Sequence, residues 1–288
     1  MTYPLLFSIY YPHDQKCRLV KWGILPLLAG NDFNTVNFFF SNYKGENITM
    51  YLSNGNKARG EKLVKDIKDS MDSFFDEHKA KALKMQLPLN QLFMDFPYNS
   101  IYFWERDPFK TAEATAKLQN PAAYYHLLSM HCLKRLSLEN RWDDAATFKI
   151  FLELLMVLNI HFRLKYHIEA MAVFKELIEA IKRRAGDKGY LIDVFLQQGQ
   201  DIYRQERLAI HDTFNSIKNQ IIGETDLVQN RVEDWLEIIH LKQKTEPGQI
   251  QNVTSWIIME IILDISSRID LSQKGLIQAV GLVSMMKE

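Results

Sequence analysis

The sequence has little cysteine and no excess of either charge. Cys17 and Cys132 are the only cysteines among 288 residues, and they lie far apart. A disulfide framework or a thiolate zinc site requires more cysteines at closer spacing, so we expect reduced thiols and a cytoplasmic protein. Lys plus Arg and Asp plus Glu both number 35, whereas a nucleic-acid-binding protein usually carries a basic excess. We therefore expect no nucleic-acid partner.

Common nucleotide-binding and hydrolase motifs are also missing. The sequence contains no G-x-x-x-x-G-K-[ST], G-x-G-x-x-G, G-x-S-x-G or H-E-x-x-H pattern. His126 and His131 fall on a predicted helix with their side chains about 140° apart around its axis, so they do not face one ligand. His161 and His167 flank a predicted helix break, but no third ligand stands at a recognisable spacing. We expect neither a metal nor a cofactor.

Long uninterrupted hydrophobic runs are absent as well. The two most apolar segments are Ile150–Phe162 and Trp256–Ile265. Glu153 interrupts the first segment, and Glu260 and Asp264 interrupt the second, so neither reaches the roughly 20 apolar residues of a membrane span. The N-terminal segment has no positively charged start and no small-residue cleavage site of a secretory signal. We expect buried helices and no membrane span.

A β-hairpin is the clearest local pattern. The stretch FFFSNYKGENITMYLS has two halves rich in aromatic and β-branched residues around Lys44-Gly45, which predicts strands at Val36–Phe40 and Ile48–Leu52. Alternation along a strand places Asn47, Thr49 and Tyr51 on one face, and Ile48, Met50 and Leu52 on the other. One face is expected to be core, and the other a binding or catalytic surface.

The remaining patterns predict an α+β fold. Leu5–Tyr11 and NSIYFWER have the composition of strands, and Cys17–Leu28 has helical spacing with Pro26 near its end. A further helix carries an apolar stripe of Leu63, Ile67, Met71, Phe74 and Phe75. Additional helices are predicted at 109–118, 121–138, 142–161, 165–184, 190–220, 225–243, 251–269 and 271–287. We expect a sheet-containing part at 1–107 and a helical part at 108–288, together forming one compact domain.

The aromatic cluster IYFWER, next to Arg106, has two interpretations. Its rings can pack in the core with the tyrosine hydroxyls reaching water. Alternatively, an exposed strand edge can form a groove that accepts an added peptide strand. On the second interpretation, the candidate peptide-binding residues are Asn47, Thr49, Tyr51, Tyr102, Trp104 and Arg106.

Three stretches resemble one known family. They are Tyr3–Tyr11 followed by ILPLLAGNDFNTVNFFFSNYKGENITMYL, then FPYNSIYFWERDPFKTAEATA, then SWIIMEIILDISSRIDLSQKGLI. In order and spacing they are similar to the thiopeptide-type bacteriocin biosynthesis domain, which is also the C-terminal glutamate-elimination domain of lanthipeptide (lantibiotic) dehydratases. The resemblance covers essentially the whole chain and implies a role in maturing ribosomally synthesised peptides.

The charged residues of the family motifs are replaced in this sequence. A His and two Arg of the family hairpin correspond to Asn47, Thr49 and Tyr51, and a Glu and an Arg of the second motif correspond to Ser100 and Phe103. In the third motif Ile258, Met259 and Glu260 stand in place of His-Met-His, and Leu263 stands in place of Arg. Glutamate elimination requires a base and cationic stabilisation of the leaving carboxylate, which these positions no longer supply.

Three functions remain open on this sequence. The first is a stand-alone protein like the elimination domain, which binds a precursor peptide or a dehydratase subunit without the lyase chemistry. The second is an enzyme of the same fold that uses other residues, either a lyase acting on glutamylated Ser/Thr or a cyclase like the related pyridine-forming synthases. The third is an unrelated helical interaction scaffold. Self-association of the chain is open in each case.

Overall fold

The structure is a computed structural model that describes residues 5–12, 15–31, 33–53, 60–80, 96–105, 121–139, 144–223, 231–244 and 250–286. The chain divides into two compact units. The sheet unit comprises Met1–Asp143 and Ser267–Asp270, and the helical unit comprises Asp144–Ser266 and Leu271–Glu288. A small sheet in the first unit and helices throughout the second confirm the α+β class.

The described elements follow the predicted order closely. The strands are β1 (Leu5–Tyr10), β2 (Thr35–Ser41), β3 (Asn47–Ser53) and β4 (Ser100–Phe103). The helices of the sheet unit are α1 (Lys16–Arg18), a π-helical turn (Leu19–Ile24), α2 (Leu25–Ala29), α3 (Gly60–Glu77) and α5 (Pro121–Leu138). The other helices are α6 (Asp144–Tyr166), α7 (Ala170–Ala185), a 3₁₀ turn (Gly186–Lys188), α8 (Tyr190–Gln205), α9 (Arg207–Ile222), α10 (Arg231–Lys244), α11 (Ile250–Arg268) and α12 (Gln273–Val283).

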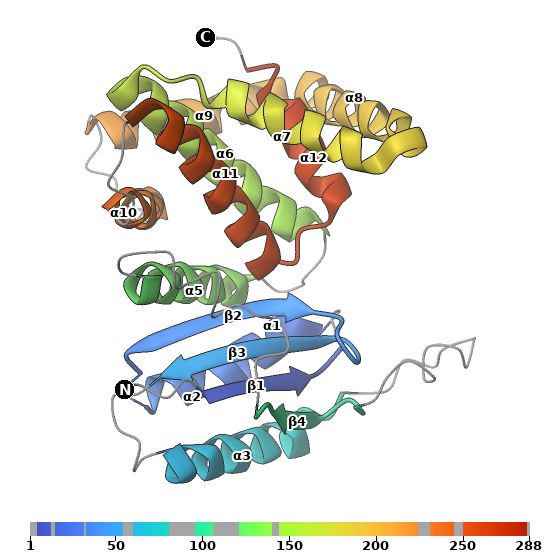
Figure 1. The fold of residues 1–288 in the computed structure, drawn as a ribbon, viewed down its shortest axis with the longest axis vertical. Helices are drawn as coiled ribbons and strands as arrows, with labels where there is room; N and C mark the ends of the chain where they lie inside the picture. Colours follow the sequence, from blue (N-terminus) through green and yellow to red (C-terminus); the bar gives the residue numbers. More distant parts are fainter. Residues whose placement is uncertain are drawn as a thin grey trace. The chain divides into compact units, whose positions relative to one another are not determined.

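The strands of the described chain form an antiparallel sheet in the order β2-β3-β1-β4 (Figure 1). Strands β2 and β3 are the predicted hairpin, with Phe38 opposite Met50. Strand β4 pairs with β1 and confirms the strand predicted in NSIYFWER. The sheet therefore brings the hairpin and the IYFWER segment to opposite sides of one central strand.

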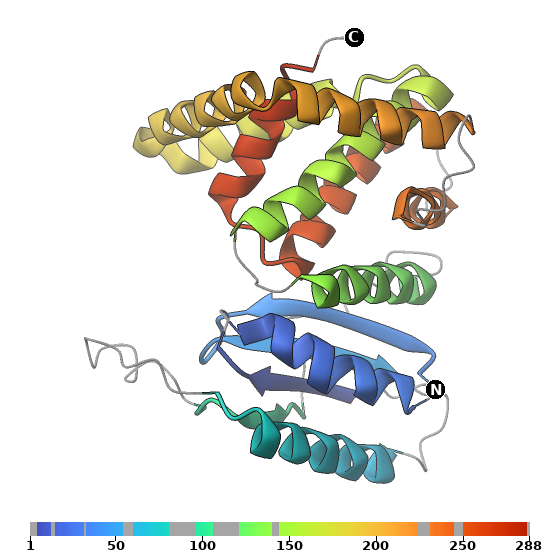
Figure 2. The same ribbon diagram turned by 180° about the vertical axis from the view of Figure 1, so that it is seen from behind.

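One face of the sheet is the core of this unit. Its buried side chains, each at most 1% exposed, are Phe7, Ile9, Val36, Phe38, Ile48, Met50 and Leu52. The helical segment α1–α2 covers this face, and α3 and α5 lie to either side of it (Figure 2). All five side chains of the predicted apolar stripe on α3 are buried. The prediction that Ile48, Met50 and Leu52 face the core is confirmed.

Two buried cations of the sheet unit are held by residues distant in sequence. The Lys16 side chain is 1% exposed, pairs with the Asp270 carboxylate and lies 4.1 Å from the centre of the Phe40 ring. Burial lowers the pKa of Lys16 to about 8, although Asp270 acts in the opposite direction. Arg268 donates a hydrogen bond from Nη2 to Oδ1 of Asn37 at 2.7 Å. These contacts explain why residues 267–270 belong to the sheet unit.

In the helical unit, α8 and α12 cross with their backbones almost in contact (Figure 1). A Cβ atom built on Gly199 would lie 2.0 Å from the carbonyl oxygen of Gln278, and one on Gly281 would lie 2.4 Å from that of Leu196. Both separations are far below a van der Waals contact. This crossing therefore requires glycine at both positions.

Helix α6 forms the apolar centre of the helical unit. Within the described chain it is the helix that is long and apolar enough to cross a membrane by composition, over Ala145–Tyr166 with a mean hydropathy of 1.5. However, 72% of that window is buried inside the protein, as in the core helix of a globular unit.

Some predicted boundaries differ from those observed. The predicted helix 190–220 is two helices, α8 and α9, separated at Glu206, where neither glycine nor proline marks the break. The predicted helix 109–118 and the predicted boundary at residue 107 lie outside the described residues. The two units divide at residue 143, because α5 packs on β2. Whether the units act as one domain stays a prediction.

Candidate functional site

The second face of the sheet carries the residues that the sequence singled out. Asn47, Thr49 and Tyr51 alternate along β3, and Tyr102 of β4 and Trp104 just after it lie on the same face. Central strand β1 connects the two groups, since its Ser8 stands opposite both Thr49 and Tyr102. The structure thus brings these five residues together on one surface. Arg106 lies outside the described residues.

A chain of hydrogen bonds runs across this face. Trp104 donates from Nε1 to Oγ of Ser8 at 2.9 Å, and the hydroxyls of Ser8 and Thr49 are 2.8 Å apart. Thr49 donates to Oδ1 of Asn47 at 2.8 Å, so Ser8 must be the donor to Thr49, which has one hydroxyl proton. The Asn47 amide then donates to two carbonyls of the hairpin turn, at 3.0 and 2.8 Å. The neutral groups on this face are therefore bonded to one another.

Aromatic side chains cover this chain of hydrogen bonds. We define the aromatic cluster as Tyr10, Tyr43, Phe96, Tyr102 and Trp104, whose neighbouring ring centres are 4.5 to 5.7 Å apart. Asn47 and Thr49 have no exposed surface, whereas Tyr43 is 43% and Tyr102 39% exposed. The accessible part of the predicted site is therefore aromatic. Asn47 and Thr49 are buried beneath the rings and hydrogen-bond to neighbouring residues of the sheet.

Sequence reasoning missed Ser8, Tyr43 and Phe96. The signal for Ser8 was present, because alternation along β1 places it on the face opposite Phe7 and Ile9. Phe96 precedes β4 and Tyr43 lies in the hairpin turn, so no strand periodicity indicated their positions.

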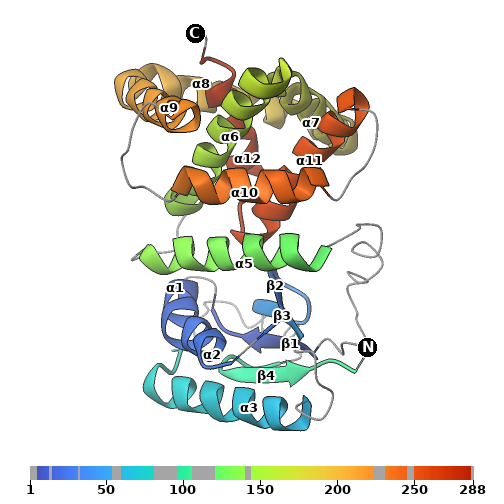
Figure 3. The ribbon, with the colours of Figure 1, turned by 90° about the vertical axis from the view of Figure 1, so that its left-hand side faces the viewer.

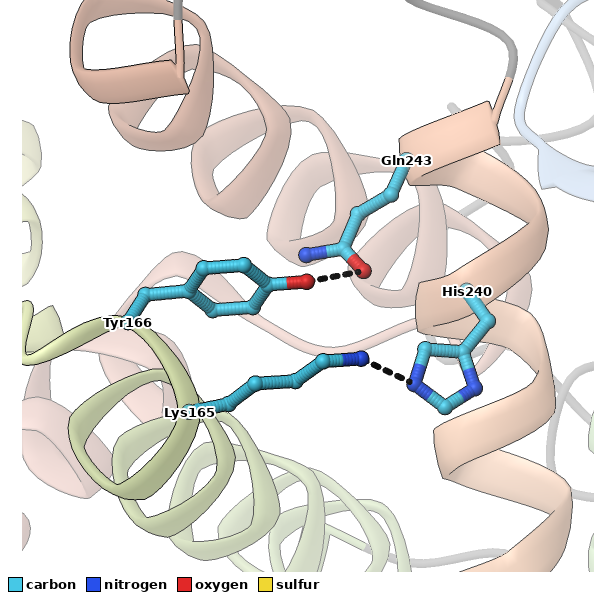
Figure 4. A pocket seen from close by; sticks show the side chains of 4 residues that line it. All are labelled: Lys165, Tyr166, His240 and Gln243. Carbon is cyan, nitrogen blue, oxygen red and sulfur yellow. Dashed lines mark hydrogen bonds between the residues drawn. The ribbon is translucent and has the colours of Figure 1, made fainter.

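A pocket in the helical unit gathers ionisable groups that were not predicted together. Lys165 and Tyr166, at the end of α6, face His240 and Gln243 of α10 across a volume of about 420 Å³ (Figure 4). Lys165 Nζ lies 3.3 Å from Nε2 of His240, and the Tyr166 hydroxyl donates to Oε1 of Gln243 at 3.2 Å. The α6 and α10 helices that supply these residues are also seen in Figure 3.

His161 lies one helical turn before Lys165. Its ring centre is 5.3 Å from that of His240, it is 5% exposed, and its Nε2 has no hydrogen-bond partner among the described residues. Burial, followed by the positive charges of His240 and Lys165, lowers the pKa of His161 to about 4. His161 is therefore neutral at pH 7. No group of three His, Cys, Asp or Glu in the described part of the chain is arranged to hold a metal.

We expect His161 to make the protein acid-sensitive. Its pKa is lowered from 6.5 to about 4, so the unfolded chain binds a proton before the folded chain does as the pH falls. Its contribution to the free energy of unfolding should fall between pH 6.5 and 4 and then level off, by about 3 kcal/mol in total. Urea unfolding at pH 7 and pH 4.5 measures this difference.

The control for this prediction is a pair of variants. His161→Phe keeps an aromatic ring but cannot titrate, so its stability should depend less on pH than that of the wild type. His167→Asn changes an exposed histidine and should keep the wild-type dependence. If His161→Phe loses as much stability at low pH as the wild type, His161 is not the cause of the acid sensitivity.

Glu260, which lies in the third of the stretches compared in the sequence analysis, forms an ion pair. Glu260 pairs with the fully buried Lys242 ammonium at 2.6 Å, and Asp264 lies 3.9 Å from the same nitrogen. Ile258 is buried, and Leu263 is 50% exposed. On α11, Ile258 therefore contributes to packing, and Glu260 forms an internal ion pair.

Several solved structures are similar to this chain in fold, and two of them are described here. The first is a pyridine synthase, TbtD, from thiomuracin biosynthesis, with a TM-score of 0.70 and 14% sequence identity over 98% of this chain and 96% of that chain. The second is TsrL, with a TM-score of 0.64 and 9% identity over 98% of this chain and 94% of that chain. No protein-family model and no curated protein sequence matches significantly. The chain therefore shares the fold of this pyridine synthase over nearly its whole length.

Proposed function

We propose that this protein takes part in the maturation of a ribosomally synthesised peptide of the thiopeptide type and binds the precursor peptide at the aromatic cluster. The observation that carries the proposal is the fold shared with the thiomuracin pyridine synthase over 98% of the chain. The β2–β3 hairpin, whose absence would have favoured an unrelated helical scaffold, is present and packed by helices.

The surface of the sheet unit suits an extended peptide. Exposed tyrosines offer large apolar contact areas with a polar tip, and such side chains often dominate peptide and protein interfaces. Trp104 is half-buried next to the exposed Tyr102, with their ring centres 4.6 Å apart, and the half-buried Tyr51 lies on the same face of the sheet. The hydrogen bond from Trp104 to Ser8 fixes the indole, so little side-chain entropy is lost on binding. A dehydratase subunit is the alternative partner for the same surface.

Replacing Tyr102 by alanine should weaken peptide binding at least about tenfold, because truncating a hot-spot aromatic side chain costs about 2 kcal/mol or more and about 1.4 kcal/mol corresponds to tenfold. The probe is a labelled precursor peptide with a Ser/Thr/Cys-rich end, encoded by a gene next to that of this protein. Fluorescence anisotropy gives the dissociation constant. Tyr190→Ala, at a 65% exposed tyrosine of the helical unit, is the matched control and should bind as the wild type does.

Absence of binding to any neighbouring precursor or dehydratase would contradict the proposal. If Tyr102→Ala and Tyr190→Ala weaken peptide binding equally, the aromatic cluster is not the binding site.

A second candidate function is an enzyme of the same fold, a cyclase or a lyase acting on glutamylated Ser/Thr. The pocket of the helical unit favours it, because Lys165, Tyr166 and His240 converge there and can transfer protons. Mass spectrometry of the same peptide after incubation distinguishes the two functions. Dehydroamino acids or a macrocycle support the enzyme, and an unchanged mass supports binding alone.

A further inference from the structure

The pocket between α6 and α10 is rich in hydrogen-bond donors. The exposed Lys165 ammonium supplies up to three N–H groups, and its nitrogen lies 3.3 Å from the ring of His240. Gln243 accepts the Tyr166 hydroxyl proton at Oε1, so its amide nitrogen is directed away from that bond and remains a donor. The pocket therefore presents donors from two helices to one space (Figure 4).

Carboxylates are missing from the described lining of this pocket. Lys165, Tyr166, His240 and Gln243 line it, and neither Asp nor Glu is among them. Within the described chain, Lys165 forms no ion pair, in contrast to Lys182, which pairs with Asp193 at 2.6 Å. An ammonium that has no ion pair among the described residues creates a local positive potential.

The buried His161 strengthens this conclusion. Its ring centre lies 5.3 Å from that of His240, and it is 5% exposed. Burial lowers its pKa and keeps it neutral at pH 7. A neutral imidazole there adds no competing negative charge. The arrangement favours a negatively charged ligand over a neutral or cationic one.

We propose that this pocket binds a small oxyanion, a carboxylate or a phosphate group, with the Lys165 ammonium as its main partner and the Gln243 amide as an additional donor. The Tyr166 ring provides the apolar wall, since Lys165 Nζ lies 5.4 Å from its centre. The pocket lies wholly within the helical unit, so the proposal does not depend on peptide binding at the aromatic cluster.

Titration of the full-length protein with L-glutamate and with inorganic phosphate tests the proposal. We follow the ring signals of His240 by ¹H–¹⁵N NMR, with sodium chloride added to keep the ionic strength equal. Saturable shifts with at least one of the two anions are expected. A response to glutamate alone assigns a carboxylate ligand, a response to phosphate alone assigns a phosphate group, and a response to both assigns a general oxyanion site.

Lys165→Met should weaken this binding at least tenfold. Lys175→Met removes an exposed lysine from α7 and should leave the dissociation constant unchanged, which controls for the overall loss of one positive charge. Gln243→Met is a second variant that tests the pocket without altering charge, and it should weaken binding several-fold. No saturation with either anion, or equal binding by Lys165→Met and the wild type, would overturn the proposal.

Discussion

Replacing Gly199 by alanine should destabilise the helical unit by about 3 kcal/mol or more, because overpacking at a close contact typically costs about 1–3 kcal/mol and this clash is with backbone. The new methyl group would lie 2.0 Å from the carbonyl oxygen of Gln278, and a main-chain atom cannot rotate away as a flexible side chain can. Helices α8 and α12 would have to separate, and their buried side chains would lose contacts. Urea unfolding followed by circular dichroism measures the change.

Gly30→Ala is the matched control for this variant. Gly30 has a φ of −80°, and its added Cβ would lie 3.5 Å from the nearest atom, the carbonyl oxygen of Pro26. Alanine is compatible with that conformation and can even stabilise it slightly. Gly281→Ala should resemble Gly199→Ala, because its Cβ would lie 2.4 Å from the carbonyl oxygen of Leu196. A Gly199→Ala protein as stable as Gly30→Ala would show that the helices are not held this close.

The second large effect is expected at the buried lysine of α10. Glu260→Gln removes the carboxylate that lies 2.6 Å from Lys242, whose side chain is fully buried. Breaking a fully buried ion pair from one side costs about 3–5 kcal/mol, and we expect the lower end of this range or slightly less, because Glu260 is 34% exposed and Asp264 remains 3.9 Å from the Lys242 nitrogen. Thermal and urea unfolding measure the loss.

A double variant distinguishes this explanation from a simple loss of packing. In Lys242→Met with Glu260→Gln the buried charge is gone, so the protein should be more stable than Glu260→Gln alone. Glu179→Gln is the surface control. Its pair with Lys182 spans 3.5 Å and Glu179 is 61% exposed, so the change should be below about 1 kcal/mol. If the double variant is less stable than Glu260→Gln, the uncompensated charge is not the cause.

The sequence predicted the sheet and its core face well, because strand alternation is a local signal. Ile48, Met50 and Leu52 had to share a face once the turn at Lys44-Gly45 was recognised, and pairing with β2 then buried them. The break at Glu206 was not predictable in this way. No residue there disfavours helix, so tertiary packing rather than local propensity must separate α8 from α9.

The candidate sites show the same limit. Alternation placed Asn47, Thr49 and Tyr51 on one face, but it did not predict that Asn47 and Thr49 would be fully buried beneath the aromatic cluster. The pocket of the helical unit was missed because Lys165 and His240 are 75 residues apart and neither belongs to a motif. Only packing of α10 against α6 brings these residues together.

The path of the chain limits how this protein can be dissected. Residues 267–270 return to the sheet unit after the chain has passed through most of the helical unit, and they carry Arg268 and Asp270. A fragment ending at residue 143 would lack the carboxylate that neutralises Lys16 and the guanidinium bonded to Asn37. The sheet unit is therefore not self-sufficient without residues 267–270, and a separately expressed sheet unit would need them grafted back before its peptide binding could be tested.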